Sequence, residues 1–196
     1  MSPLTKQQLD QIRDERTRQI KQAALKVFAR HGFLRTKTSM IASAAGISEG
    51  LIYRYFESKD RLFTTIVQEL MEAAESEIDD SRQLPGTPYE QIKALTRNML
   101  DEENKFAFML VLQARKSNGL QPELAQILEH YSVDSMIDRL LPLVVQGQET
   151  GQFAAGDPRQ LLCWYFSVVN SLILQEQGDE EYGFPDVDVL LRMLTK

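Results

Sequence analysis

Apolar positions recur along most of the chain at the three- and four-residue spacing of a helix with one buried face. The first such stretch places Ile20, Ala24, Val27 and Phe28 on one side and ends at Gly32, which can stop a helix. No segment alternates apolar and polar residues over the length of a strand. The pattern therefore predicts an all-α fold of about nine helices.

Capping residues and prolines predict where further helices begin. Ser58 can cap a helix whose apolar positions follow at helical spacing. Asp157 and Pro158 are typical of an N-cap followed by a first helical residue. The apolar run 106–112 predicts a helix that is buried on most of its sides.

The stretch from Leu124 to Leu141 carries one more helical pattern, which we expect to form a single element. Pro142 is expected to bend or divide that helix, because proline removes a hydrogen bond within it. Gly147 and Gly151 are expected to mark its end.

Residues 37–56 have the composition of a helix-turn-helix. Small alanines allow a short helix to pack closely on a neighbour, and Gly46 can adopt the left-handed conformation of a tight turn. Ile47 can then fill the space between the two helices, while Ser48 caps the second one. That second helix, from Ser48 to Tyr55, is short enough to place its exposed side chains in a major groove.

The charges of the chain are unevenly distributed. Its 196 residues carry a net charge of −6, but residues 1–62 alone carry +6 and the remainder −12. Such asymmetry indicates a polyanion-binding head on an acidic body, although a solvated helix with clustered lysines and arginines gives the same count.

The region around the helix-turn-helix resembles the N-terminal signature of the tetracycline-repressor (TetR) family over residues 18–63. The matching positions are Gly32-Phe33, Thr36, Ile41-Ala42, Ala45-Gly46-Ile47-Ser48, Gly50, Ile52-Tyr53, Tyr55-Phe56, Ser58-Lys59 and Leu62-Phe63. This resemblance implies an all-helical homodimeric transcription regulator with a three-helix DNA-binding head, residues 1–62. It also implies a body, residues 63–196, that dimerises and binds a small molecule.

The chemistry of the exposed positions in the head predicts the contacts with DNA. Lysines and hydroxyl groups suit phosphates, while Arg54, Glu49 and Leu51 can contact guanine, cytosine and a thymine methyl respectively. Arg54 can equally contact a phosphate or pair with Glu57, and Glu49 can simply be an acid at a helix N-terminus. The predicted DNA-binding residues are Lys37, Thr38, Ser39, Ser48, Glu49, Gly50, Leu51, Tyr53, Arg54, Tyr55 and Lys59.

In the body, aromatic, methionine and amide side chains are candidates for the wall of an effector pocket, although such residues also build ordinary cores. The candidates are Met99, Phe106, Met109, Gln113, Tyr131, Met136, Trp164 and Asn170. The segments 157–176 and 185–195 carry more apolar positions than one helical face needs. They are therefore the expected dimer surface, or else they close the core of one subunit.

These features favour a ligand-responsive repressor that binds a palindromic operator as a homodimer and is released by a largely apolar small molecule. An activator of the same family, or a helical protein-interaction adaptor with a basic arm, remains an alternative. We expect no enzyme activity, cofactor or metal site, because no nucleophile–base pair, glycine-rich phosphate loop or ligand cluster is evident. A single cysteine, Cys163, and the absence of a long apolar run predict a cytoplasmic protein with no membrane partner.

Overall fold

The computed structural model describes residues 5–117, 121–175 and 185–195, which form helices and, within these ranges, no strands. This confirms the all-α fold class. Ten helices follow one another within the described ranges: α1 (Lys6–His31), α2 (Thr38–Ala45), α3 (Glu49–Tyr53), α4 (Lys59–Gln83), α5 (Pro88–Leu100), α6 (Glu102–Lys116), α7 (Pro122–His130), α8 (Val133–Glu149), α9 (Pro158–Ile173) and α10 (Val187–Leu191).

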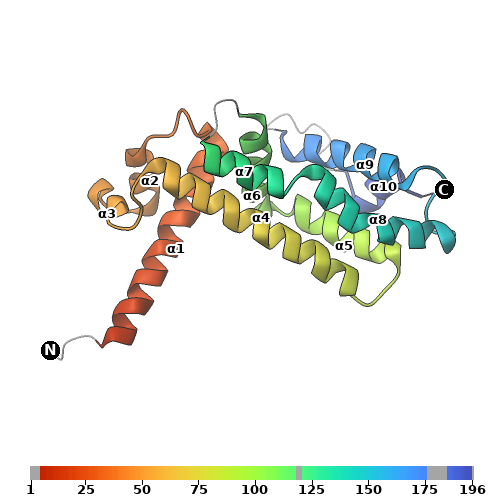
Figure 1. Ribbon diagram of the computed structural model, residues 1–196, viewed down its shortest axis with the longest axis horizontal. Coiled ribbons are helices and arrows are strands. Elements are labelled where there is room, and N and C mark those ends of the chain that lie inside the picture. Colours follow the sequence, from red (N-terminus) through yellow and green to blue (C-terminus); the bar gives the residue numbers. More distant parts are fainter. Residues whose placement is uncertain (1–4, 118–120, 176–184, 196) are drawn as a thin grey trace.

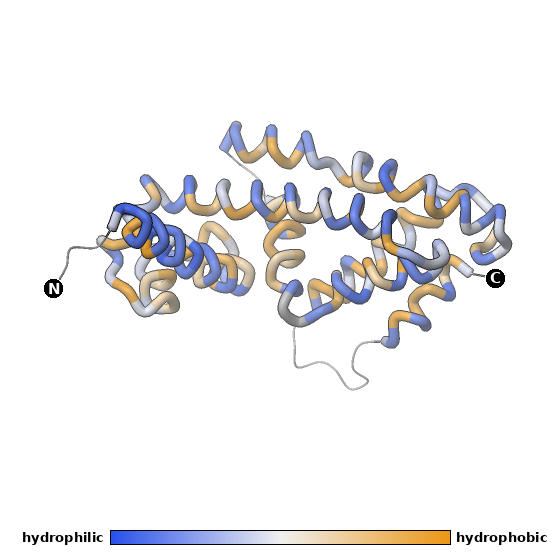
Figure 2. The backbone as a smooth tube through the Cα atoms, turned by 90° about the horizontal axis from the view of Figure 1, so that it is seen from below, coloured by the Kyte–Doolittle hydropathy of each residue, from blue (hydrophilic) through white to orange (hydrophobic). Residues whose placement is uncertain are grey.

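The helices form an elongated molecule with a small head at one end (Figure 1). α2 and α3 lie at that end beside α1, whose N-terminal half projects away from the rest and is largely hydrophilic (Figure 2). α4 runs from the head into the body, where it packs with α5, α6 and α8. The residue-62 boundary expected from the sequence lies within α4. Among the described helices, none is long and apolar enough to cross a bilayer.

Most helix starts follow the capping chemistry that their sequences predict. Ser58 Oγ accepts a hydrogen bond from the Arg61 backbone N–H at 3.0 Å, which caps α4. Asp157 Oδ1 accepts from the Gln160 N–H at 3.1 Å, and Pro158 then occupies the first turn of α9. These contacts satisfy backbone donors that a helix N-terminus otherwise leaves free.

The region predicted as one long helix is instead divided into α7 and α8, and the division lies at Tyr131 and Ser132 rather than at Pro142. Ser132 Oγ caps α8 by accepting from the Ser135 N–H at 3.1 Å. The Arg115 guanidinium binds the carbonyls of Leu128 and Tyr131 at the end of α7. Side-chain donors from α6 therefore stabilise a helix end that local sequence did not indicate.

α8 runs through Pro142 and also through Gly147, which was expected to end it. Gly147 is buried, and a Cβ atom placed on it would overlap Cδ2 of Phe153. The glycine is thus needed for close packing against an aromatic ring. Gly151, with a φ of 76°, does follow the end of the helix, as predicted.

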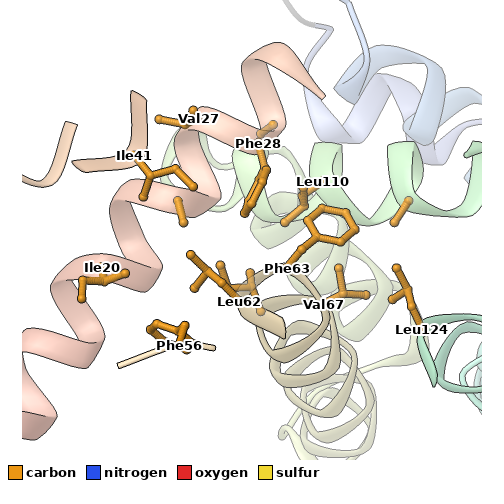
Figure 3. Close-up of a cluster of buried hydrophobic side chains, with 14 of the residues drawn as sticks. Ile20, Val27, Phe28, Ile41, Phe56, Leu62, Phe63, Val67, Leu110 and Leu124 are labelled. Atoms are coloured by element: carbon orange, nitrogen blue, oxygen red, sulfur yellow. The ribbon is translucent and has the colours of Figure 1, made fainter. Parts of the chain in front are cut away.

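Two hydrophobic clusters hold the molecule together. The first joins head and body, because Phe28 of α1 and Phe63 of α4 pack with Leu110 of α6 and Leu124 of α7 (Figure 3). The Phe28 and Phe63 rings meet edge to face with centroids 5.0 Å apart.

The second cluster lies within the body and is built from α4, α5, α8, α9 and α10. It contains a fully buried hydroxyl pair. The Thr96 hydroxyl donates to the Ile92 carbonyl at 2.8 Å, so the Tyr165 hydroxyl donates to Thr96 Oγ1 at 2.7 Å. Burial raises the pKa of Tyr165 to about 12. The pair ties α5 to α9 in the middle of the core.

Candidate nucleic-acid interface

The turn between α2 and α3 has the geometry that its sequence predicts. Gly46 ends α2 in the left-handed conformation, with φ 65° and ψ 33°. The Ile47 N–H donates to the Ala42 carbonyl at 3.0 Å, which closes the turn. Ser48 occupies the N-cap position of α3 as expected, but its hydroxyl makes no capping hydrogen bond. The Ser48 side chain is exposed to solvent.

α1 packs against the buried side of α2 and fixes its position. Ile41, Ala42 and Ala45 are buried, and the two alanines permit the close approach of the helices. In addition, Gln19 Nε2 donates to the Ala45 carbonyl at 2.7 Å, which satisfies an acceptor at the C-terminal end of α2. Gln19 is a positioning residue that was not predicted, since a polar side chain on the hydrophilic half of a helix gives no signal of its partner.

α3 is anchored by one side and presents the other to solvent. Ile52 is 2% exposed and fixes the helix on the first hydrophobic cluster. Seven of the eleven predicted DNA-binding residues are exposed: Lys37, Ser39, Ser48, Glu49, Gly50, Tyr53 and Arg54. Leu51, Tyr55 and Lys59 are half-buried, and Thr38 is buried. The exposed members belong to the start of α2 and to α3, so one end of the head presents them together.

Two of the aromatic and hydroxyl residues connect α2 with α3. The Tyr53 hydroxyl lies 3.2 Å from Thr38 Oγ1, at hydrogen-bond distance. Tyr53 is itself 52% exposed, whereas Thr38 is 8% exposed and so has little surface left for DNA. The pair fixes the start of α2 relative to the end of α3, while the Tyr53 side chain stays accessible.

Lys59 differs from its expected role. Its Nζ donates to the carbonyls of Phe33 and Thr36, both at 2.9 Å, and lies 4.2 Å from the centroid of the Phe33 ring. These contacts direct the ammonium group inward, where it ties the start of α4 to the loop after α1. In this arrangement Lys59 stabilises the head and is not directed at a phosphate.

The remaining charges of this face are free to meet a ligand. Within the described ranges neither Arg54 nor Glu49 takes part in an ion pair, so the alternative pairing of Arg54 with Glu57 is absent there. Gly50 has open space above its Cα, which allows another backbone to approach closely. A short helix with these donors, acceptors and an open glycine can contact base edges and phosphates together.

Comparison with known proteins agrees with this geometry. Residues 20–66, which comprise the end of α1, the helix-turn-helix and the start of α4, match the family model described as bacterial regulatory proteins, tetR family. The chain therefore carries the helix-turn-helix domain of the tetR family at residues 20–66. It is a transcriptional regulator with a helix-turn-helix DNA-binding domain.

Relatives of this chain extend the similarity into the body. It is 26% identical over 142 residues to a protein named fatty acid metabolism regulator protein from Bacillus subtilis (strain 168), covering 70% of this chain and 71% of that protein. Two solved structures share its fold. A tetR-family transcriptional regulator from Agrobacterium tumefaciens has a TM-score of 0.74 at 20% identity, covering 94% of this chain and 100% of that one. The fatty acid degradation regulator FadR from Bacillus halodurans has a TM-score of 0.62 at 24% identity, covering 91% and 92%.

The body of the chain contains a partly open cavity of about 110 Å³ among α4, α5, α6, α8 and α9. Three of the eight predicted pocket residues line it: Met99, Met136 and Asn170. Its other walls are mostly apolar, and they come from residues that were not predicted to line a pocket. Those residues are Met71, Ala74, Glu77, Ile78, Leu95, Phe108, Val111, Leu112, Arg115, Val133, Ile137, Leu140 and Phe166.

The other five predicted pocket residues are not among those that line this cavity, and their surroundings differ. Trp164 is 56% exposed on α9. The Arg30 guanidinium lies over the Phe106 ring, with 5.1 Å between Cζ and the ring centroid. The Tyr131 ring meets the ring of its neighbour His130 edge to face. Met109 packs against both hydrophobic clusters.

Gln113, also predicted to line the pocket, instead connects α6 to α1. Its Nε2 donates to the Ala29 carbonyl at 2.9 Å. Helical periodicity identified the correct helix but not its orientation, because α6 is apolar on most sides and packs on α1 as well as on the cavity.

Proposed function

We propose that this regulator is a ligand-responsive repressor that binds a palindromic operator as a homodimer and is released by a small, largely apolar effector. The DNA-binding domain is assigned to residues 1–62, and the effector-binding and dimerisation domain to residues 63–196. The observation that carries the proposal is the solvent-facing surface of α2 and α3. It combines Arg54, which has no ion-pair partner among the described residues, with Lys37 and three exposed hydroxyl-bearing residues on a head of charge +6.

A dimer is supported by an uncovered apolar surface at the far end of the molecule from the head. α9 and the C-terminal segment with α10 expose four large apolar side chains, each pair one helical turn apart: Trp164 and Val168, then Val189 and Met193. Their exposed fractions are 56%, 37%, 51% and 42%. Two copies related by a two-fold axis would cover this surface and hold two heads for inverted half-sites.

Release by an effector is supported by the position of the cavity. α4 and α6 contribute to its wall, and both also pack on α1 in the head. A ligand that favours one arrangement of these helices therefore changes the distance between the two heads of the dimer. Ligand binding and operator binding are coupled for this reason. The Bacillus subtilis relative is named for fatty acid metabolism, which accords with a small apolar effector.

The proposal is tested by selecting duplexes from a random library with the full-length protein and measuring affinity by fluorescence anisotropy. We expect selected sites with two-fold symmetry. Arg54→Ala should weaken binding to them about tenfold and relax the preference at one position of each half-site. Lys37→Ala should weaken binding to all sequences and make the salt dependence shallower by about one unit of slope per head.

Arg97→Ala is the matched control, because Arg97 is an exposed arginine of α5 in the body. It should leave affinity, base preference and salt slope unchanged. Asymmetric selected sites, or an Arg54 variant that binds like the wild type, would contradict the proposed DNA-binding face.

The dimer surface has its own test. Trp164→Glu places a charge in the middle of the exposed apolar surface and should shift the protein from dimer to monomer in sedimentation velocity, with its helical content unchanged. Glu149→Gln, an exposed change at the end of α8, serves as the control and should leave the dimer intact. A Trp164→Glu variant that stays dimeric would place the dimer surface elsewhere.

A further inference from the structure

One cationic side chain in the cavity wall has no negative partner among the described residues. Arg115 of α6 donates from Nη1 to the Leu128 carbonyl at 3.1 Å and from Nη2 to the Tyr131 carbonyl and to Met71 Sδ. All three acceptors are uncharged. A guanidinium has five N–H donors, so two of those of Arg115, including Nε–H, have no acceptor in the described part of the chain.

The nearby carboxylates of α4 do not neutralise Arg115. Glu75 and Asp79 both pair with Arg139 of α8. Burial lowers the pKa of Arg115, and no acid of the described residues acts against that burial. The group nevertheless stays charged, because arginine is protonated at any ordinary pH. A half-buried cation with spare donors and neutral neighbours is stabilised when an anion joins it.

The rest of the cavity defines what such an anion must carry. The walls near Arg115 are apolar, and Met71, Val111 and Leu112 are among them. A volume of about 110 Å³ is of the order of cavities that hold a benzene-sized molecule. The ligand is therefore expected to combine a single anionic group with a compact apolar body.

Glu77 also lines the cavity, and it must be reconciled with an anionic ligand. It lies six residues beyond Met71 on α4, which is about 9 Å along the helix axis. Burial, followed by the charge of Asp80, raises the pKa of Glu77. Glu77 forms no ion pair with Arg115, and its position on α4 lies more than one helical turn beyond the Met71 contact of Arg115.

We propose that the cavity binds a small monocarboxylate. Its carboxylate accepts hydrogen bonds from the free N–H groups of Arg115, and its apolar body packs between α4, α6 and α8. Arg115 is then the residue that determines the preference for an anion. The inference rests on the proposed function, since it names the chemical class of the effector.

The test compares ligands of matched shape and different charge on the full-length protein without DNA. Benzoate is compared with benzyl alcohol and benzylamine, and cyclopentanecarboxylate with cyclopentylmethanol, by isothermal titration calorimetry. Methionine labelled at its methyl group with ¹³C locates binding by NMR. We expect each carboxylate to bind about tenfold or more tightly than the matched alcohol, because charge-assisted hydrogen bonds are the stronger ones. Resonances of Met71, Met99 and Met136 should shift, while those of Met40 and Met193 should not.

Variants separate the role of charge from that of packing. Arg115→Gln should abolish the preference for the carboxylate over the alcohol, and Arg115→Lys should retain it at lower affinity. Arg97→Gln, on the body surface, should behave like the wild type. Because Arg115 also holds the end of α7, its variants are interpreted only where the circular dichroism matches the wild type. The wild-type comparison of carboxylate with alcohol decides the question without them.

The inference would be overturned by equal or tighter binding of the alcohols, or by no binding of either class at millimolar concentration. Methyl shifts that occur only at methionines outside the cavity would overturn it as well. Operator release is measured separately. A carboxylate that occupies the cavity but leaves operator affinity unchanged supports the ligand class and contradicts the proposed release. Release by benzyl alcohol but not by benzoate contradicts the ligand class and supports the proposed function.

Discussion

Phe28→Ala is expected to lower the free energy of unfolding by about 3–5 kcal/mol, the range for removing a fully buried phenylalanine. The Phe28 side chain is 0% exposed and lies among residues of α4 and α6, as Figure 3 shows. Its loss removes the edge-to-face contact with Phe63 and opens a cavity where head and body meet. Urea denaturation at a fixed protein concentration, followed by circular dichroism, measures the change.

The chain offers a matched control for this prediction just beyond the end of α1. Leu34 is 87% exposed, so Leu34→Ala should change the free energy of unfolding by no more than about 0.5 kcal/mol. Phe28→Leu should fall between the two variants. A Phe28→Ala protein as stable as Leu34→Ala would mean that the first hydrophobic cluster contributes little to holding the head on the body.

The second large effect is expected at Gly147. Gly147→Leu should lower the free energy of unfolding by about 3 kcal/mol, because its Cβ alone would overlap the Phe153 ring. Phe153 is 1% exposed, and its N–H and that of Gln152 both donate to the Gly147 carbonyl, so the ring has little freedom to move. Differential scanning calorimetry would report the change as a lower Tm.

Gly50→Ala separates overpacking from a general effect of replacing helical glycines. Gly50 lies in α3, and a Cβ atom placed on it would meet nothing within 4 Å. Alanine there should therefore leave stability unchanged or raise it by up to about 1 kcal/mol.

In the Gly147→Leu background, Phe153→Ala should restore part of the loss. If the double variant is less stable than the wild type by the full sum of the two single losses, the clash with Phe153 is not the cause.

The fold was predictable from the sequence wherever local chemistry decides it. The caps at Ser58 and Asp157 are side chains that act within a few residues of their own position, and Gly46 adopts the conformation its turn requires. The break between α7 and α8 was not predictable. It depends on Arg115, which lies 13 and 16 residues away from the carbonyls it binds.

The same distinction separates the two candidate sites. Exposed residues of α3 follow from the family pattern, because a short helix with Ile52 buried has an obvious outer face. Lys59 was assigned to phosphate because it begins a helix, but three groups of the loop between α1 and α2 attract its ammonium instead. In the body, α6 is apolar on most sides, so periodicity did not distinguish the face toward the cavity from the face toward α1. Arg115 was overlooked because a lysine or arginine in a last helical turn usually indicates a solvated end.

Neighbouring positions of α6 serve different purposes, and this limits how the regulator can be altered. Leu112 lines the cavity, while the next residue, Gln113, binds the end of α1. An engineer who wishes to give the protein a new effector therefore has unequal freedom around the same cavity. Changes on α8 and α9, at Leu140 or Asn170, can reshape the cavity at a distance from the head. Under the proposed function, changes on α6 that alter ligand preference are expected to alter operator affinity as well, even in the absence of any ligand.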